Sequence, residues 1–313
     1  MSRFLFIMRA LYALAMTVAL VSCEKAIMAV DSTTSGDKNG NLRVSVYQIE
    51  QTPFTSITRR ADNATTRAAQ DASKACTRLN FAIYDEGGSR LKQVNQTSDN
   101  ASFGQCAFQL EEGTYQLVVI GHSASSNPTM TAPTKIQFTN ATGYTDTFLC
   151  YGEVTIGEES VDYEVSLDRI VALCRFVVTD DIPAEVKKMR FYYTGGSGAF
   201  NAVTGLGCVA SKQDVKFSVE QSGQAERDVT PTGSKQFDLY TFLHDLSDNI
   251  ALTVTALDAG GNELYSRQFD VPMQQNHITW LSGAFFSDSG SSSTTISGVT
   301  VNTDWAGETY LTF

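Results

Sequence analysis

The stretch that decides the fold is Ile170-Val171-Ala172-Leu173-Cys174-Arg175-Phe176-Val177-Val178. It is apolar at nearly every position, so both of its faces favour burial, which is typical of a strand in the middle of a sheet. Shorter runs with period-two alternation or β-branched and aromatic residues lie on both sides of it. These runs cover residues 42–47, 79–84 and 115–120 before it, and 189–193, 215–219, 237–242, 250–256, 264–271 and 278–286 after it.

Polar turns separate these runs, and no helical periodicity is long enough for a buried helix. Many short strands with regular turns predict an all-β fold of two tandem antiparallel β-sandwich domains, residues 42–167 and 168–313. Smaller expectations are a helical turn within 64–76, a brief helix at 183–188, a loop at 195–198, a hairpin turn at 259–262 and a last strand pair in 294–313.

The N-terminus predicts export and lipidation. Arg3 and Arg9 precede an apolar run that ends at Ser22-Cys23, and this run is too short to cross a bilayer. We interpret residues 1–22 as a lipoprotein signal peptide that is cleaved between Ser22 and Cys23, with acyl chains added to Cys23. The alternative is an ordinary signal peptide that merely contains a cysteine. Polar residues dominate 23–41 after a short apolar patch, which predicts a flexible tether between the lipid and the fold.

Composition excludes several classes of function. The net charge of −11 opposes nucleic-acid binding, because no surplus of Lys or Arg can displace phosphate counterions. The five cysteines other than Cys23 form no C-x-x-C pair and lie near no histidine, so we expect no metal site. The three histidines, His122, His244 and His277, are far apart and fit strand ends or turns. The acidic pairs at 158–159 and 180–181 fit solvated turns, so we expect no enzyme and no cofactor.

Several features follow one another along the chain in a particular order: the lipobox, the polar tether and then strand and turn motifs at residues 79–85, 113–115, 167–172, 204–207 and 276–283. This order resembles the FimB-type fimbrial anchor family and the fimbrillin-like lipoproteins of Bacteroidales. The resemblance implies two transthyretin-like β-sandwich domains and a protein, tethered to the outer membrane by lipid, that seats or limits a surface fimbria. Its implied partners are the membrane, fimbrial stalk subunits bound by strand addition, and host or bacterial surface ligands.

Two alternatives stay open. Fimbrial stalk and tip subunits resemble the chain as well, and in them an arginine-specific protease removes the first strand; Arg59, Arg60 and Arg67 follow the first strand here and are the candidate cleavage sites. The second alternative is a surface glycan-binding lipoprotein that uses an exposed aromatic ring. Trp280 lies in an apolar strand and is expected in the core, whereas Trp305 has polar neighbours and is the candidate for exposure.

Overall fold

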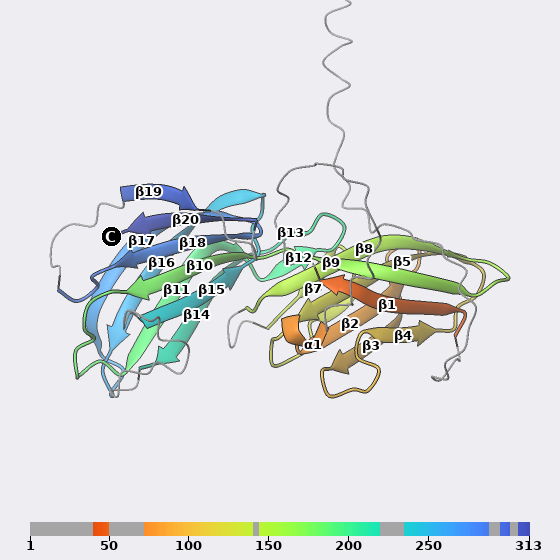
Figure 1. The fold of residues 1–313 in the computed structure, drawn as a ribbon, viewed down its shortest axis with the longest axis horizontal. Helices are drawn as coiled ribbons and strands as arrows, with labels where there is room; N and C mark the ends of the chain where they lie inside the picture. Colours follow the sequence, from red (N-terminus) through yellow and green to blue (C-terminus); the bar gives the residue numbers. More distant parts are fainter. Residues whose placement is uncertain (1–39, 50–71, 140–143, 220–234, 288–294, 301–305) are drawn as a thin grey trace, which may run out of the picture.

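The computed structural model describes residues 40–49, 72–139, 144–219, 235–287, 295–300 and 306–313 of the chain (Figure 1). Within these ranges the secondary structure is almost entirely β, and the helix α1 (Ala72–Ala75) is a single turn. No helix in the described ranges has the length and the apolar composition needed to cross a membrane. The predicted all-β class is therefore confirmed.

The N-terminal half forms a seven-stranded sheet in the order β3-β2-β5-β8-β9-β1-β4. Its strands are β1 (Leu42–Ile49), β2 (Arg78–Tyr84), β3 (Arg90–Thr97), β4 (Gln105–Phe108), β5 (Gly113–His122), β8 (Thr147–Ile156) and β9 (Val161–Arg169). The apolar side chains of β1, β2, β5, β8 and β9 that point to one face form the first hydrophobic core, around Phe81, Leu117 and Phe148.

The C-terminal half is built from two sheets that enclose a second core. The five-stranded sheet has the order β15-β10-β18-β20-β19 and the four-stranded sheet the order β14-β11-β16-β17. Their strands are β10 (Ala172–Val178), β11 (Lys188–Ser197), β14 (Ala210–Ser218), β15 (Lys235–Thr241), β16 (Ser247–Leu257), β17 (Glu263–Gln274), β18 (His277–Gly283), β19 (Thr295–Thr300) and β20 (Gly307–Thr312). Phe176 on β10 lies at the centre of this core, against the rings of Phe191, Phe269 and Phe313.

A fourth sheet joins the halves. It pairs β6 (Thr129–Ala132) and β7 (Lys135–Gln137) from the N-terminal half with β12 (Ala199–Asn201) and β13 (Leu206–Gly207) from the C-terminal half. The crossing pair is β7 with β12, through Gln137 with Ala199 and Ile136 with Phe200. Figure 1 shows β12 and β13 between the two halves. A third core lies here and takes side chains from both halves, including Tyr84, Ile120, Val171, Phe200 and Phe242.

The predicted strands are found, and β10 lies between β15 and β18 as its two apolar faces require. The hairpin turn before β17 and the last strand pair, β19 with β20, are also confirmed. The antiparallel prediction is wrong for three pairs, since β1 with β9, β10 with β18, and β18 with β20 are parallel. Parallel pairing requires a long crossover between the strands, and the strand pattern alone does not reveal such a crossover.

Two local predictions are wrong. Residues 183–188 form only a turn, in which the Val186 N–H donates to the Pro183 carbonyl, and no helix. Gly195 and Gly196 belong to β11 and not to a loop. A Cβ on Gly196 would lie 2.0 Å from Thr241 Oγ1, so glycine is needed where β11 passes β15 closely.

Candidate functional site

The residues that sequence analysis assigned to maturation lie outside the described residues. These are Ser22 and Cys23 at the signal cleavage site and Arg59, Arg60 and Arg67 after the first strand. Their roles therefore stay predictions. The described residues do include β1, the strand between these two groups of positions, and its pairing decides what cleavage on either side of it would do.

The strand β1 is an interior strand of the N-terminal sheet. It runs parallel to β9 from Leu42 opposite Val161 to Ile49 opposite Leu167, and antiparallel to β4 from Leu42 opposite Phe108 to Ser45 opposite Gln105. Both of its edges are therefore hydrogen-bonded. If β1 left the sheet, β9 and β4 would each expose a row of unpaired backbone groups, which is a template for another strand.

The side chains of β1 also fill the first core. Leu42, Val44 and Ile49 are 0%, 1% and 4% exposed. Burying each such side chain contributes roughly 1.5–3 kcal/mol. The start of β1 is held further by Asn41, whose side chain donates to the Leu110 carbonyl at 2.8 Å and accepts the Leu110 N–H at 2.9 Å. The strand is thus part of the fold and not a loosely attached arm.

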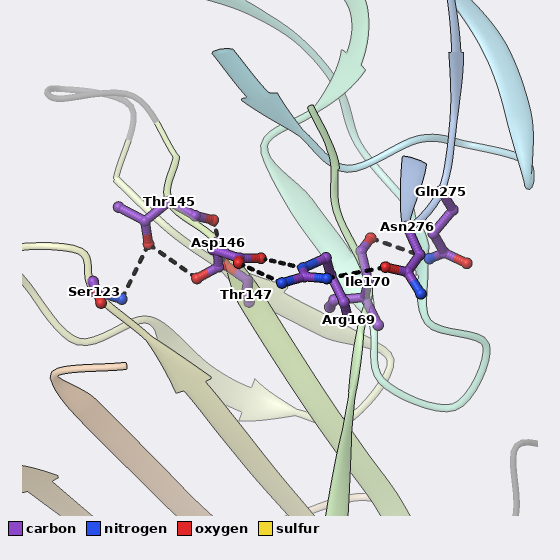
Figure 2. A network of polar contacts seen from close by, with 8 residues as sticks. All are labelled: Ser123, Thr145, Asp146, Thr147, Arg169, Ile170, Gln275 and Asn276. Carbon is purple, nitrogen blue, oxygen red and sulfur yellow. Dashed lines mark hydrogen bonds and ion pairs between the residues drawn. The ribbon is translucent and has the colours of Figure 1, made fainter. Parts of the chain in front are cut away.

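A polar network lies at the junction of the two halves (Figure 2). The Arg169 guanidinium, at the end of β9, donates to both carboxylate oxygens of Asp146, at 2.7 and 2.9 Å, and to Asn276 Oδ1 at 3.2 Å. Gln275 donates its side-chain amide to the Ile170 carbonyl at 3.1 Å. Because the Arg169 side chain is only 4% exposed, its charge is held by this network and not by water.

The network links the turn before β18 to the N-terminal sheet. Asn276 has a φ of 56°, the left-handed conformation that asparagine tolerates better than most residues. This junction was not predicted from the sequence. A charged residue beside a long apolar run, as Arg169 is, indicates a buried partner, but no local pattern identifies that partner as Asp146.

Trp280 on β18 is partly buried and packs against the third core, so its predicted core position is confirmed only in part. Tyr310 stacks on one side of its ring, with ring centroids 5.6 Å apart and an angle of 9°. The Arg175 guanidinium covers the ring at 4.9 Å from its centroid, and the cross-strand partner Asp238 holds Arg175 with two hydrogen bonds of 2.8 Å. Since neighbours on both adjacent strands cover the ring, Trp280 does not offer a free face for a sugar to stack on.

The titratable groups show no catalytic arrangement among the described residues. His122 ends β5, is fully buried and bonds to Asn80 Oδ1 at 2.8 Å; burial and the nearby Arg78 lower its pKa to about 4. His244 lies in a turn and His277 begins β18, as expected for strand-end and turn histidines. No group of three or more His, Cys, Asp or Glu side chains in the described ranges could hold a metal ion.

Asp180 follows β10 and has a structural role. Its carboxylate accepts the backbone N–H groups of Phe285, Phe286 and Ser287 at 2.9, 2.7 and 2.7 Å. Partial burial acts to raise the pKa of Asp180, but these hydrogen bonds outweigh it and hold the pKa below its usual value. Asp180 therefore fixes the segment that follows β18.

Three thiols, two of them buried and that of Cys106 partly buried, have raised pKa values. Burial raises the pKa of Cys76, Cys106 and Cys174 to about 12, so these groups stay protonated at neutral pH. Cys208 is a free, exposed thiol between β13 and β14. None of these positions forms a redox pair or a nucleophile with an adjacent base.

These observations define an all-β protein of two strand-built halves joined by a shared core, with its first strand built into the sheet. The chain belongs to the family of unknown function DUF6562, whose family model matches residues 34–312. No curated protein matches the sequence.

Solved structures with a similar arrangement come from Bacteroidales. A candidate adhesin from Bacteroides ovatus has 14% identity and a TM-score of 0.43, over 62% of this chain and 76% of the other. The fimbrial anchor protein Mfa2 from Porphyromonas gingivalis has 12% identity and a TM-score of 0.41, over 72% of this chain and 80% of the other. The tip fimbrial protein Mfa3 from the same organism has 12% identity and a TM-score of 0.31, over 63% of this chain and 76% of the other. All three are described as adhesion or fimbrial proteins and none as an enzyme.

Proposed function

We propose that this protein is a lipid-anchored fimbrial protein of the outer-membrane surface, and that it acts as the anchor that seats or limits a fimbria. On this proposal, residues 1–22 are the signal peptide, residues 23–41 are the tether, and 42–167 and 168–313 are two transthyretin-like domains. The membrane holds the acyl chains on Cys23, and fimbrial stalk subunits bind by strand addition.

The observation that carries the proposal is the position of β1. The tether leads directly into a strand that is paired on both sides and whose apolar side chains lie in the core. A lipid at Cys23 would therefore be connected to the folded body through a strand that cannot leave without opening the sheet. This is the connection that an anchor needs.

The alternative is a stalk or tip subunit matured by arginine-specific cleavage. One observation favours it: Arg59, Arg60 and Arg67 lie between β1 and β2 in the chain, so cleavage there would separate β1 and the lipid from the rest of the protein. Removal of β1 would then leave a gap between β9 and β4 that a donor strand from a neighbouring subunit could fill.

The mature N-terminus decides between the two roles. We expect the protein purified from outer membranes to begin at Cys23 and to carry acyl chains by mass spectrometry, and Cys23→Ser to release it from the membrane. A protein that begins after Arg59, Arg60 or Arg67 would contradict the anchor role and support the subunit role. The matched control is the triple variant with lysine at these three positions, which keeps the charge but resists an arginine-specific protease.

Surface exposure and partner binding need separate tests. We expect protease added to intact cells to degrade the protein, and a fimbrial stalk subunit to purify with it. A glycan-binding role through an aromatic ring has less support, because both sides of the Trp280 ring are covered and Trp305 lies outside the described residues. Equal polysaccharide binding by the wild type and Trp305→Ala would dismiss Trp305 as a sugar platform.

A further inference from the structure

A strip of hydrogen-bond donors lies along the β2–β3 hairpin in the N-terminal half. The side chain of Asn80 on β2 donates to Asn95 Oδ1 on β3 at 2.8 Å and to Asn127 Oδ1 in the loop before β6 at 3.1 Å. Gln93 donates to the same Asn95 oxygen at 2.8 Å. Asn95 and Asn127 are exposed and Gln93 is partly exposed, so this chain of amides lies at the surface.

An arginine lies at each end of the chain of amides. Arg78, at the start of β2, donates to Asn127 Oδ1 at 3.3 Å and to the Ser125 carbonyl at 2.9 Å. Arg90, at the start of β3, donates to Gln93 Oε1 at 2.5 Å. We call Arg78, Arg90, Gln93, Asn95 and Asn127 the donor strip. Their side-chain oxygens accept hydrogen bonds within the cluster, so the groups left to face solvent are N–H donors.

The two arginines differ from most of the others in the described ranges. Neither has a carboxylate within 4.0 Å, and Asp85 in the adjacent turn accepts the Ser89 N–H instead. Four other arginines are each paired with an aspartate: Arg43 with Asp162, Arg169 with Asp146, Arg175 with Asp238, and Arg190 with Asp214. In a chain with a net charge of −11, two arginines without such partners on one surface make a local positive site.

We propose that the donor strip binds an acidic polysaccharide, through the carboxylate or sulfate oxygens of the polymer. Arginine and amide N–H groups match such oxygens, and charge-assisted hydrogen bonds are stronger than neutral ones. Arg78 and the partner of Arg90, Tyr84, are six residues apart on β2, which is about 20 Å along a strand. A polymer reaches both ends of the strip, whereas a single small anion does not.

The hydrogen-bonding pattern favours a polysaccharide over an acidic peptide. A peptide brings backbone N–H groups, and the side-chain oxygens of the donor strip, which are already bonded, offer these groups few acceptors. Sugar hydroxyls accept hydrogen bonds and can keep their own hydrogens toward water. This binding would use a surface away from β1 and does not depend on the fimbrial role, so either proposal can fail without the other.

The test uses the purified full mature chain in native gels that contain one polymer at a time. The polymers are polygalacturonate, dextran sulfate, neutral dextran and poly-glutamate. We expect polygalacturonate or dextran sulfate to retard the protein, in a way that weakens with salt, and neutral dextran and poly-glutamate to have no such effect. Comparison of polygalacturonate with dextran sulfate identifies the acidic group.

The variant Arg78→Gln/Arg90→Gln removes both ends of the strip. We expect its affinity for the retarding polymer to fall at least roughly tenfold. The matched control is Arg43→Gln/Arg190→Gln, which changes the net charge equally on other strands and should bind within about twofold of the wild type. Asn95→Asp, an exposed change that adds one negative charge to the strip, should also weaken binding, and circular dichroism checks that each variant is folded.

Several results would overturn the proposal. They are no retardation by either acidic polysaccharide, equal retardation by neutral dextran, or an equal loss of affinity in the control. Retardation by poly-glutamate as strong as that by the polysaccharides would assign the strip to an acidic peptide instead.

Discussion

Replacing Arg169 with methionine should lower the free energy of unfolding more than replacing an arginine in one of the exposed ion pairs of the protein. Methionine keeps much of the apolar stem but removes the two hydrogen bonds to Asp146 and the one to Asn276. It also removes the guanidinium that lies 4.9 Å from the Phe148 ring. The substitution therefore leaves the Asp146 carboxylate at the junction without its ion-pair partner.

The expected magnitude follows from burial. Removing one partner of a fully buried pair costs about 3–5 kcal/mol. The Arg169 side chain is 4% exposed but that of Asp146 is 24% exposed, so water solvates part of the carboxylate that remains. We therefore expect the free energy of unfolding to fall by about 2–4 kcal/mol. In the matched control Arg190→Met the pair is 38% and 42% exposed, and the expected loss is about 0–1 kcal/mol.

Urea unfolding followed by circular dichroism measures both variants. Because the third core takes side chains from both halves, we expect the wild type to unfold in one transition. A loss below about 1 kcal/mol for Arg169→Met, or a loss equal to that of the control, would refute the argument that the junction network stabilises the fold. Two separate transitions in the wild type would show that the halves unfold independently.

Three further predictions concern other parts of the chain. The pKa of His122 is about 4 in the folded protein and about 6.5 in the unfolded chain, so its contribution to the free energy of unfolding is complete above pH 6.5 and falls by about 3 kcal/mol as the pH drops to 4. In urea unfolding at a series of pH values, His122→Gln should lose less stability over this range than the wild type. An equal loss in the variant would assign the pH dependence to other groups. A Cβ on Gly283 would lie 2.1 Å from the Phe313 carbonyl oxygen, so Gly283→Val should loosen the C-terminal strand. We expect faster amide hydrogen exchange in β20 of the variant than in β20 of the wild type, and unchanged exchange in β8. Equal exchange rates in β20 of the two proteins would contradict the close contact. In the native protein Cys208 should react with iodoacetamide and Cys174 should not, since Cys174 is fully buried; labelling of Cys174 before unfolding would contradict this.

The strands could be predicted from sequence because their signal is local. The run through Phe176 is apolar on both faces, and it became an interior strand with the second core on one side. Glycines in the turn before β17 and at the start of β5 also marked real strand boundaries, and Gly261 and Gly113 both have positive φ. These features depend on residues a few positions apart, which period and turn rules describe.

The arrangement of the strands could not be predicted in the same way. Asp146 and Arg169 meet because β8 and β9 pair, and Asn276 joins them from more than 100 residues further along the chain. Gly195 looked like part of a loop because glycine-rich runs are usually turns, yet here the small residues allow β11 to pass close to its neighbours. The donor strip was missed for a similar reason, since its amides come from two strands and a loop.

The direction of β1 bears on the choice between anchor and subunit. Because β1 is parallel to β9, it begins beside Val161 and ends beside Leu167, close to the junction, so the tether would join the body at the end of the N-terminal half far from the C-terminal half (Figure 1). On the proposed anchor role, a pull on the C-terminal half would act along β1 and load its hydrogen bonds to β9 and β4 together, not one after another. While β1 is continuous with residues 50–71, a covalent link supports these hydrogen bonds, and a cut at Arg59, Arg60 or Arg67 would leave the lipid attached to a strand held by non-covalent contacts alone. An anchor therefore requires these arginines to stay uncut, whereas a subunit that accepts a donor strand requires the cut.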